Sequence, residues 1–373
     1  MTWGTVLPHA AVSLKALTIL LVGLVGWAVP TMQPVYSAES TIAPPQAPQS
    51  RQVVLVIVGA AGAPEYATRF TAWAKLWEQA CAKSNAALIP VGLNESGASS
   101  DRERIQEILT LQAAEEVGRA SALAEGSRAG THDLPPSSTL WLVLIGHGTF
   151  DGRTAKFNLR GPDLSARDLA EWLKPLHRPI AVIDSTSSSA PFLKELSAPG
   201  RIVITATKSG FEQNYTRFGQ YFASAIVDPN ADLDKDGQTS LLEAFLSASH
   251  ATGQFYAGAG RLTTEHALLD DNGDGLGTPA EWFRGIRPVQ RAQDGAALDG
   301  YRAHQLHLLN SPTETALPPE LRAKRDQLEL QVMDLRDNKA KHSEDEYFSK
   351  LEPLLREIAQ IYEQADKSGS SGK

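Results

Sequence analysis

The chain has 373 residues, a formal net charge of -8 and 42% hydrophobic residues, a composition typical of a globular protein with an ordinary core. It has no run of Lys and Arg residues and no segment that interleaves Arg with aromatic residues, which argues against nucleic acid as a partner. Its one cysteine, Cys81, excludes an intramolecular disulfide, so the core alone must stabilise the fold.

Residues 1–38 are predicted to be an export signal. A lysine precedes the apolar run 16–29, and small residues near Ser37 and Ala38 offer a cleavage site. Because the run is shorter than the ~20 residues of a spanning helix, we expect cleavage, with a retained membrane anchor as the alternative. The mature protein is therefore expected in the periplasm or outside the cell. Residues 39–51, rich in Pro and Gln, are expected to be a linker.

Continuous apolar runs rich in β-branched residues predict a parallel sheet that is covered on both faces. These runs are 53–59, 86–92, 139–146, 179–184 and 201–207. Segments with helical periodicity lie between them, at 65–83, 101–113 and 165–174. Alternating strands and helices imply right-handed crossovers, and functional groups in such sheets lie at the carboxyl ends of the strands.

Cys81 is expected to lie in the core. It continues the helical spacing of Phe70, Trp73 and Trp77, which places its thiol on the buried stripe of the helix over 65–83. A thiol in that position is a packing residue, so we do not expect Cys81 to act as a nucleophile.

His147 follows the strand at 139–146 and lies between Gly146 and Gly148. Glycines at a strand end let the backbone approach a ligand closely, and they leave the Gly148 amide able to face a developing oxyanion. An imidazole in this position can act as a general base, although a hydrogen-bonded loop histidine gives the same pattern.

The order of elements over residues 52–285 resembles the legumain- and caspase-like cysteine peptidases. In that family a His-Gly pair after one strand acts with a cysteine after the next, and the matching residues here are 146–148 and 185–190. Residues 202–222 are similar to the strand and pocket-side loop that follow the nucleophile in secreted bacterial relatives. The resemblance implies a three-layer, caspase-like α/β fold with a mostly parallel central sheet.

The resemblance places Ser187 where the family has its cysteine, with Thr186 as the neighbouring alternative. Neither residue is a thiol, and Cys81 lies elsewhere, so thiolate chemistry in the family's arrangement is excluded. A hydroxyl needs a base that a third group orients, and Asp151 and Asp184 are the candidates for that group.

Residues 232–243 match the twelve-position calcium loop of EF-hands. The candidate ligands are Asp232, Asp234, Asp236, the backbone carbonyl of Gln238, and Glu243 at the last position. Ca²⁺ prefers about six to eight hard oxygen ligands, which alternating carboxylates and a closing glutamate can supply. A glycine at the sixth position permits the sharp turn that such a loop requires.

Residues 270–281 repeat this spacing, and the candidate ligands are Asp270, Asn272, Asp274 and Glu281. The alternative for both loops is a turn that leads into a capped helix, because Ser240 with Glu243 and Thr278 with Glu281 have capping-box spacing. If calcium binds, its expected role in an exported protein is structural.

Residues 286–319 are predicted to be a second linker, 320–365 a helical hairpin with two apolar stripes, and 366–373 a disordered tail. Ser343 is expected to cap the second helix, and Pro353 to kink it. Such a hairpin serves packing or partner binding, so oligomerisation through 320–365 is possible.

Three functions follow as hypotheses. The first is an exported protein with a peptidase fold and no cysteine-peptidase activity, which binds a peptide or protein partner. The second is a serine-type hydrolase that uses Ser187 and His147. The third is a calcium-stabilised assembly module that works through the hairpin. In a purely structural interpretation of 185–189, the hydroxyls only cap the helix that begins near Pro191, with Ser189 or Ser188 as the cap.

Overall fold

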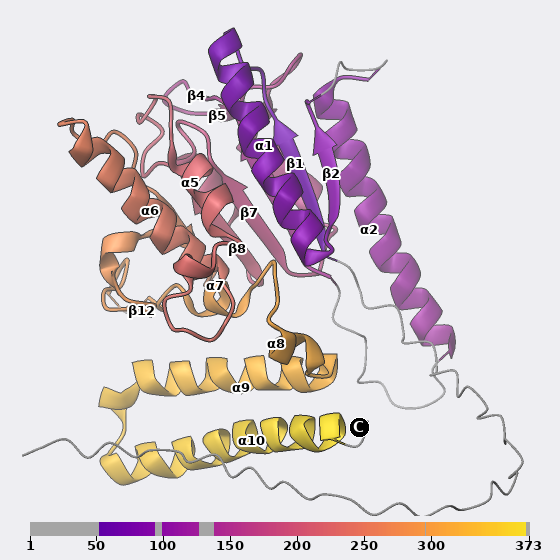
Figure 1. The fold of residues 1–373 in the computed structure, drawn as a ribbon, viewed down its shortest axis with the longest axis vertical. Coiled ribbons are helices and arrows are strands. Elements are labelled where there is room, and N and C mark those ends of the chain that lie inside the picture. Colours follow the sequence, from indigo (N-terminus) through magenta and orange to yellow (C-terminus); the bar gives the residue numbers. More distant parts are fainter. Residues whose placement is uncertain (1–51, 94–98, 127–137, 295, 371–373) are drawn as a thin grey trace, which may run out of the picture. The chain divides into compact units, whose positions relative to one another are not determined.

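The computed structural model describes residues 52–93, 99–126, 138–294 and 296–370 (Figure 1). The predicted export signal, the predicted linker 39–51 and the last three residues lie outside this part of the chain. Within it, no helix has both the length and the hydropathy needed to cross a membrane.

A seven-stranded sheet with the order β10-β9-β8-β7-β3-β1-β2 forms the centre of the protein. Its five parallel strands are β1 (Val53–Val58), β2 (Ala87–Val91), β3 (Leu140–Ile145), β7 (Ile180–Asp184) and β8 (Arg201–Thr205). Two short strands, β9 (Leu268–Asp270) and β10 (Thr278–Pro279), extend one edge in the antiparallel sense. The five predicted strands and the mostly parallel α/β fold are confirmed.

Helices cover both faces of this sheet (Figure 1). One face packs against α1 (Pro64–Ser84), α5 (Phe218–Ala225) and α6 (Leu241–Gly258). The other packs against α2 (Asp101–Gly126), α3 (Ala166–Leu173) and α4 (Ala190–Leu196). Alternate residues of each central strand enter opposite cores, which is why the middle residues of these strands are apolar on both faces.

Shorter elements surround the sheet. After β3 the chain forms a three-stranded antiparallel sheet from β4 (Gly148–Phe150), β5 (Ala155–Phe157) and β6 (Leu164–Ser165). A two-stranded ribbon joins β11 (Phe283–Arg284) to β12 (Arg287–Pro288). The structure also has three short 3-10 helices in the described residues: η1 (Pro229–Ala231), η2 (Ala280–Trp282) and η3 (Lys339–Lys341).

The segment 286–319 is not a linker, which corrects the prediction. It contains α7 (Tyr301–Gln305) and α8 (Pro312–Ala316), and it buries Ala303, Leu308 and Leu317. Asp271 accepts hydrogen bonds from the amides of Gly300 and Ala303, at 2.9 and 2.8 Å, and so holds the start of α7. These helices are too short to give a periodic pattern, and contacts with distant residues hold them in place.

The predicted hairpin is confirmed as the pair α9 (Pro319–Asp337) and α10 (Glu344–Ser370). Leu328 and Ile361 are buried between these helices. Helix α10 contains Pro353 and continues to Ser370, so residues 366–370 of the predicted tail are helical. The Gly- and Ser-rich composition of 366–373 predicted a disordered tail, but the last turn of the long helix α10 extends into this segment.

A hydrogen-bonded glutamine ties the first strand to the C-terminal part of the chain. Trp141, fully buried on β3, donates from Nε1 to Gln52 Oε1 at 2.7 Å. Gln52 Nε2 in turn donates to the carbonyls of His307 and Leu308, at 3.0 and 3.4 Å.

We expect Gln52→Ala to lower the free energy of unfolding by about 2 kcal/mol, because it leaves the Trp141 donor buried without its acceptor. Gln106→Ala, an exposed change on α2, is the matched control and should stay within about 0.5 kcal/mol. Urea denaturation measures both. Equal effects of the two substitutions would show that the Trp141 bond contributes nothing.

Candidate functional site

The loops that carry the predicted site residues meet at the carboxyl edge of the sheet. His147 follows β3 and the hydroxyl run Ser185–Ser189 follows β7, and these strands are hydrogen-bonded neighbours with Leu144 opposite Asp184. The two loops touch directly, since the amide of Gly148 donates to Ser187 Oγ at 3.2 Å. The adjacency expected from the alternating pattern is therefore present.

Gly148 permits this close approach because it has no side chain. A Cβ at position 148 would lie 2.0 Å from the Ser187 carbonyl oxygen and 2.8 Å from Thr186 Oγ1, which is closer than any real contact. The loop after β3 and the loop after β7 thus pack backbone against backbone. Any larger residue would force them apart.

Four of the five hydroxyls in the run have hydrogen-bond partners in the backbone or in neighbouring side chains. Ser185 Oγ donates to the Leu144 carbonyl at 2.6 Å, and Thr186 Oγ1 donates to Asp184 Oδ1 at 2.7 Å. Ser187 Oγ donates to the Gly148 carbonyl at 3.1 Å while accepting from its amide. All five residues are at most 4% exposed. We call Ser185–Ser189 the polar seam, because this buried run joins the loops after β3 and β8 by hydrogen bonds.

The last two residues of the run connect to the loop after β8. Ser189 and Thr207 share a hydroxyl–hydroxyl bond of 3.0 Å, and Thr207 Oγ1 also accepts from the Ala190 amide at 3.1 Å. The first turn of α4 is therefore capped by Thr207, not by the side chain of Ser189. Ser188 has a φ of 55° and donates from its amide to the Glu212 carbonyl at 2.8 Å.

His147 faces a different set of groups. Its Nε2 lies 3.2 Å from the carbonyl oxygen of Ala61, and a carbonyl only accepts, so this bond requires the proton on Nε2. Tyr66 and Phe70 of α1 pack edge-on against the imidazole, with ring centroids 4.7 and 5.2 Å away. Burial lowers the pKa of His147, and the Ala61 bond offsets part of that effect. The lowered pKa favours the neutral ring, and the bond to Ala61 then leaves Nδ1 as the unprotonated nitrogen.

Neither Asp151 nor Asp184 orients His147. Asp151 accepts from the amides of Arg153 and Thr154, at 2.8 and 2.7 Å, and so closes its own exposed turn. Asp184 continues the row of β7 residues that enters the core against α3 and α4, on the opposite face of the sheet from the α1 rings around His147. The Ala61 carbonyl takes the orienting position instead.

Asp184 is a fully buried carboxyl group. Its Oδ1 accepts from the amide and the hydroxyl of Thr186, whereas its Oδ2 is buried with no hydrogen-bond partner among the described residues. Burial raises the pKa of Asp184 to about 7, although the two Thr186 bonds lower it. This carboxyl therefore fixes Thr186 through two hydrogen bonds. Because of its raised pKa, it is largely protonated below neutral pH.

Aromatic and cationic side chains border the His147 side of the edge. The guanidinium groups of Arg69 and Arg217 lie over the Tyr215 ring, 5.2 and 5.7 Å from its centroid. On the loop after β8, Phe211 is 73% exposed and packs edge-on against Phe150, with ring centroids 5.3 Å apart. Phe211 and Arg69 are exposed whereas Tyr215 and Arg217 are half-buried, so the rim of this edge is partly apolar and partly accessible.

Cys81 lies in the core, as expected. It is 3% exposed on α1 and belongs to the cluster that contains Trp73 and Trp77. Tyr66 and Phe70 are the α1 residues that pack against His147, and Cys81 lies eleven residues beyond Phe70, about 16 Å further along the helix. Its thiol cannot reach the imidazole.

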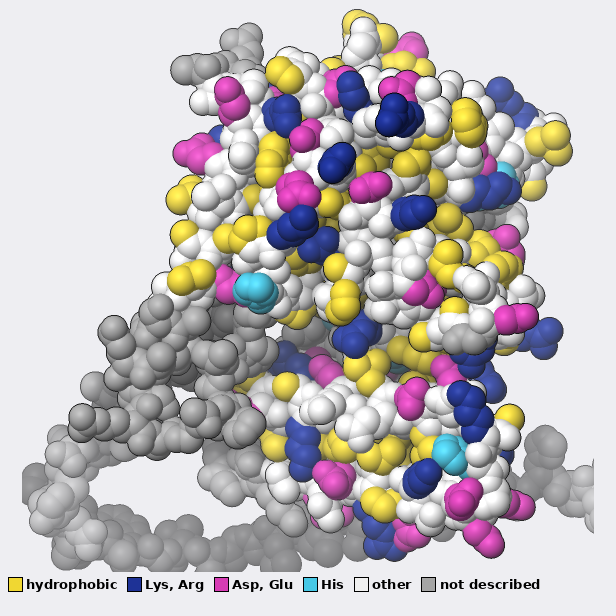
Figure 2. All heavy atoms as spheres, turned by 180° about the vertical axis from the view of Figure 1, so that it is seen from behind, with side chains coloured by type: hydrophobic (Ala, Val, Ile, Leu, Met, Phe, Trp, Pro, Cys, Tyr) yellow, Lys and Arg dark blue, Asp and Glu magenta, His cyan; other side chains and the backbone are white. Residues whose placement is uncertain are grey.

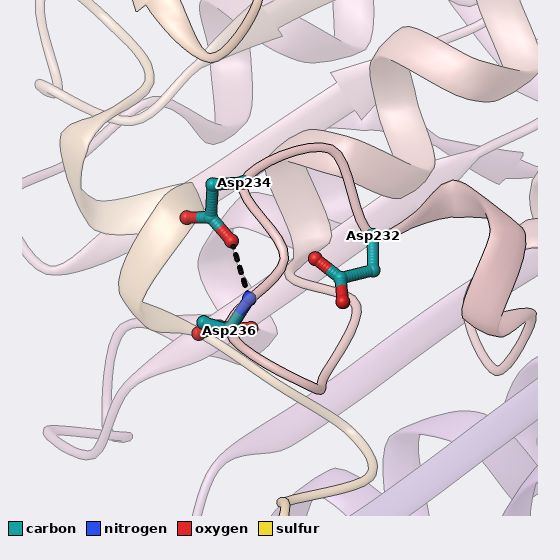
Figure 3. Close-up of side chains that lie close together, drawn as sticks. All are labelled: Asp232, Asp234 and Asp236. Carbon is teal, nitrogen blue, oxygen red and sulfur yellow. Dashed lines mark hydrogen bonds between the residues drawn. The ribbon is translucent and has the colours of Figure 1, made fainter. Parts of the chain in front are cut away.

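The first acidic loop gathers three predicted ligands. Ligand atoms of Asp232, Asp234 and Asp236 lie within 4.8 Å of one another, and Figure 3 shows the three carboxylates around one point of the loop. Asp232 accepts from the amides of Lys235 and Gly237, both of which have positive φ. Hard carboxylate oxygens at this spacing suit Ca²⁺.

Glu243 and Gln238 have additional roles in this loop. Glu243 Oε1 accepts from the amides of Leu233 and Asp234, at 2.7 and 3.3 Å, so the last position closes the loop onto its start. Its Oε2 completes the capping box with Ser240, as that spacing predicts. Gln238 uses its side chain to contact Asp236 and the Ser311 amide.

The second acidic loop has the same backbone conformation. Asp270 accepts from the amides of Gly273 and Gly275, the same relative positions that Asp232 uses, and both glycines have positive φ. Asn272 and Asp274 accept from the amides two residues after each, at 2.8 Å. The two loops are thus structural repeats, although different elements follow them.

Glu281 does not occupy the closing position of the second loop. It is exposed on η2, and Thr278 lies in β10, so the predicted capping box there is wrong. Asp299 takes its place, because its Oδ1 accepts from the amides of Asp271 and Asn272, at 3.0 and 3.3 Å. These are the same two loop positions that Glu243 bonds in the first loop.

Sequence reasoning missed Asp299 because it lies outside the twelve-residue window. It is 1% exposed and accepts from Thr278 Oγ1 at 2.6 Å. Burial, with the neighbouring charge of Asp271, raises the pKa of Asp299 to about 8. The only sequence signal is an acidic residue beside a glycine inside the apparent linker, which is too common a pattern to identify a ligand.

Of three comparisons with known proteins, the one with solved structures finds similar chains. No protein-family model matches this chain, and no curated protein matches it in sequence. Among solved structures, it is similar to the Drosophila initiator caspase Dronc, with 16% sequence identity and a TM-score of 0.37, over 69% of this chain and 95% of that one. Caspase-1 from Spodoptera frugiperda is similar with 8% identity and a TM-score of 0.37, over 62% and 92% of the respective chains.

The raised pKa of Asp184 predicts a pH dependence of stability. Between about pH 4 and pH 7 the folded protein holds a proton that the unfolded chain releases, so stability contributed by this group falls as pH rises. The melting temperature of the wild type should therefore fall, relative to that of Asp184→Asn, as the pH rises from 5 to 8, because asparagine does not titrate. The control Asp151→Asn changes an exposed carboxyl whose pKa is lowered, and its difference should stay constant. A constant Asp184 difference would contradict the assignment.

Proposed function

We propose that this protein is an exported, peptidase-like protein of the legumain and caspase type that has no peptidase activity, and that it binds an extended peptide or protein segment at the carboxyl edge of its sheet. The supporting observation is the hydrogen bonding of Ser187. Its hydroxyl donates to the Gly148 carbonyl and accepts from the Gly148 amide, so it links two loops.

The protons of both candidate nucleophiles point to acceptors other than the histidine. Ser187 donates to a carbonyl and Thr186 donates to the Asp184 carboxyl, and neither bond involves His147. A nucleophilic hydroxyl must pass its proton to a base within hydrogen-bond reach. The Gly148 amide, the candidate oxyanion donor, is also bonded to Ser187 Oγ. Activation would require both loops to rearrange.

The rim of the edge supports binding without cleavage. Phe211 offers an exposed ring beside the seam, and Tyr215 carries two guanidinium groups next to His147. Exposed aromatic and arginine side chains are the groups that most often carry binding energy at protein interfaces. A peptide segment bound across this rim would lie over Ser187, whose buried hydroxyl is already hydrogen-bonded to Gly148.

We expect a fluorophosphonate probe to leave the purified protein unlabelled, because a hydroxyl committed to the Gly148 backbone is not nucleophilic. Intact-mass spectrometry measures the labelling of the wild type, Ser187→Ala and His147→Ala. The serine-type hydrolase is favoured instead if the wild type is labelled stoichiometrically and both substitutions abolish labelling.

Peptide capture tests the binding half of the proposal. A pool of fluorescent hexapeptides should be retained uncut, and Phe211→Ser should weaken retention by about tenfold because it removes an exposed aromatic anchor. Val117→Ser, at an apolar site on α2 that is 63% exposed, is the control and should leave retention unchanged. Equal retention by all three proteins would place binding elsewhere.

We also propose that both acidic loops bind structural Ca²⁺. The first would use Asp232, Asp234, Asp236, the Gln238 carbonyl and Glu243, and the second Asp270, Asn272 and Asp274, with Asp299 in the closing position. The support is the shared backbone pattern, in which a carboxylate closes each loop onto the same two amides. An exported protein meets enough calcium for modest sites to fill.

Calcium is expected to raise the melting temperature, since binding to the folded state alone adds about 2.7 kcal/mol at a hundred times the dissociation constant. Calorimetric titration should give one fewer bound ion in Asp232→Ala, and likewise in Asp299→Asn. Glu281→Gln is the matched control and should bind as the wild type does. The proposal fails if chelator leaves the melting temperature unchanged, and the Asp299 assignment fails if Glu281→Gln loses an ion instead.

A further inference from the structure

A pocket of about 170 Å³ lies beside the start of α5. Its walls come from the end of β8, from α5, α6 and η2, and from the segment that leads into β9. Among the described residues, none that contacts His147 or Ser187 lines this pocket. Because a cavity of about 150 Å³ holds a benzene molecule, the pocket has room for one group of side-chain size.

Part of the pocket wall is apolar. The apolar side chains of the lining are Ala206, Phe218, Ala267 and Ala280. Gly253 leaves further room on the α6 side, because a Cβ at that position would meet no atom within 4 Å. A ligand that fits this wall must therefore present an apolar or weakly hydrated surface to it.

The hydroxyls of α6 that line the pocket can only accept hydrogen bonds from a ligand. Ser249 Oγ donates to the Phe245 carbonyl at 2.7 Å, and Thr252 Oγ1 donates to the Ala248 carbonyl at 2.8 Å. Each hydroxyl has a single proton, so these bonds leave only lone pairs for the pocket. Thr263, the other hydroxyl of the lining, can accept as well as donate.

His266 also presents an acceptor to the pocket. Its Nδ1 lies 2.5 Å from Glu212 Oε1, and this nitrogen carries the proton because a carboxylate only accepts. In the neutral imidazole, Nε2 is then the nitrogen with the lone pair. Glu212 follows Phe211 in the chain, so the same bond connects the pocket wall to the rim of the proposed binding edge.

Two carboxylates line the pocket, and neither is in an ion pair within the described residues. They are Glu265, which is 2% exposed, and Glu281, which is exposed. Glu265 accepts from two amides at the start of α5, at 2.7 and 3.0 Å, and from the Tyr256 hydroxyl at 3.0 Å. Burial raises the pKa of Glu265, and these amides oppose the shift. A cation in the pocket would favour the ionised carboxylate further.

The charge of the pocket differs from that of the surface seen from behind. Figure 2 shows acidic and basic side chains interspersed over that face of the protein, whereas both carboxylates of the pocket lack a basic partner. The polar side chains of the wall offer acceptors and negative charge. A complementary ligand brings N–H donors and positive charge.

We propose that this pocket binds a guanidinium group. A guanidinium has five N–H donors and no acceptor, which matches a wall of hydroxyl, imidazole and carboxylate acceptors. It is also more weakly hydrated than an ammonium group and stacks on aromatic rings, which suits a wall that includes Phe218. The group belongs either to an arginine of the bound peptide segment or to a free small guanidine. The first source rests on the proposed peptide binding, whereas the pocket itself does not.

Titration with n-butylguanidine, followed by nitrogen-15 NMR of the full chain, tests the pocket. The amide signals of Gly253 and Ala267 should shift with a dissociation constant of about 1 mM, as expected for a ligand of this size. The neutral isostere n-butylurea and the compact cation n-butylammonium should each bind about tenfold more weakly. The proposal is overturned if neither amide shifts, or if the urea or the ammonium compound binds as tightly as the guanidine.

A variant that fills the pocket tests its location. Gly253→Leu places a side chain in the open space and replaces a glycine within α6 by a better helix former, so the fold should be retained while n-butylguanidine no longer binds. Gly258→Leu is the matched control, because it lies on the same helix with equally open space and outside the lining. Glu281→Gln should weaken binding by about threefold, since it removes one exposed charge. Binding that survives Gly253→Leu overturns the assignment.

Two hexapeptides that differ only in arginine or citrulline identify the source of the group. Citrulline keeps the shape of arginine and loses its charge, so the arginine peptide should bind about tenfold more tightly, and Gly253→Leu should abolish this difference. Equal retention of the two peptides, with n-butylguanidine still bound, assigns the pocket to a free guanidine. Retention of neither peptide contradicts the proposed function and leaves the n-butylguanidine result unaffected.

Discussion

The backbone contact between Gly148 and Ser187 is the constraint on which the candidate site depends. It joins the loop after β3 to the loop after β7 at van der Waals distance, and only a glycine fits there. Because Ser187 Oγ accepts from the amide of Gly148 and donates to its carbonyl, the hydroxyl links the loop after β3 to the loop after β7. His147, one residue earlier, is turned toward α1 and bonds to Ala61.

Other polar groups around Ser185–Ser189 are also paired with one another by hydrogen bonds. Asp184 accepts from Thr186, Thr207 caps α4, and Glu212 accepts from the Ser188 amide, which joins the loops after β7 and β8. With the bond between Gly148 and Ser187, three loops meet in one buried hydrogen-bonded layer. Buried polar groups are costly when unpaired, and networks of this kind favour a single arrangement. A site built in this way can present a rigid edge to a binding partner, whereas a nucleophile would require a hydroxyl with a free proton path.

The sequence predicted the scaffold well because its signals are local. Each central strand is an uninterrupted apolar run, and the Ser165–Asp168 and Ser240–Glu243 boxes mark helix starts by spacing alone. The misses depend on distant partners. Helices α7 and α8 are held by contacts such as Asp271 with Gly300, and Asp299 closes a loop that begins 29 residues before it. Which acceptor a serine or histidine chooses is equally a matter of tertiary contacts.

Nitrogen-15 NMR of His147 tests the central claim most directly, with His147→Gln used to assign its signals. We predict a neutral ring protonated at Nε2 by the Ala61 bond, a pKa below the ordinary histidine value, and no change of either in Ser187→Ala. A hydrogen bond between the imidazole and the Ser187 hydroxyl would contradict this account. It would appear as a shift of the Nδ1 resonance, or of the pKa, when the hydroxyl is removed.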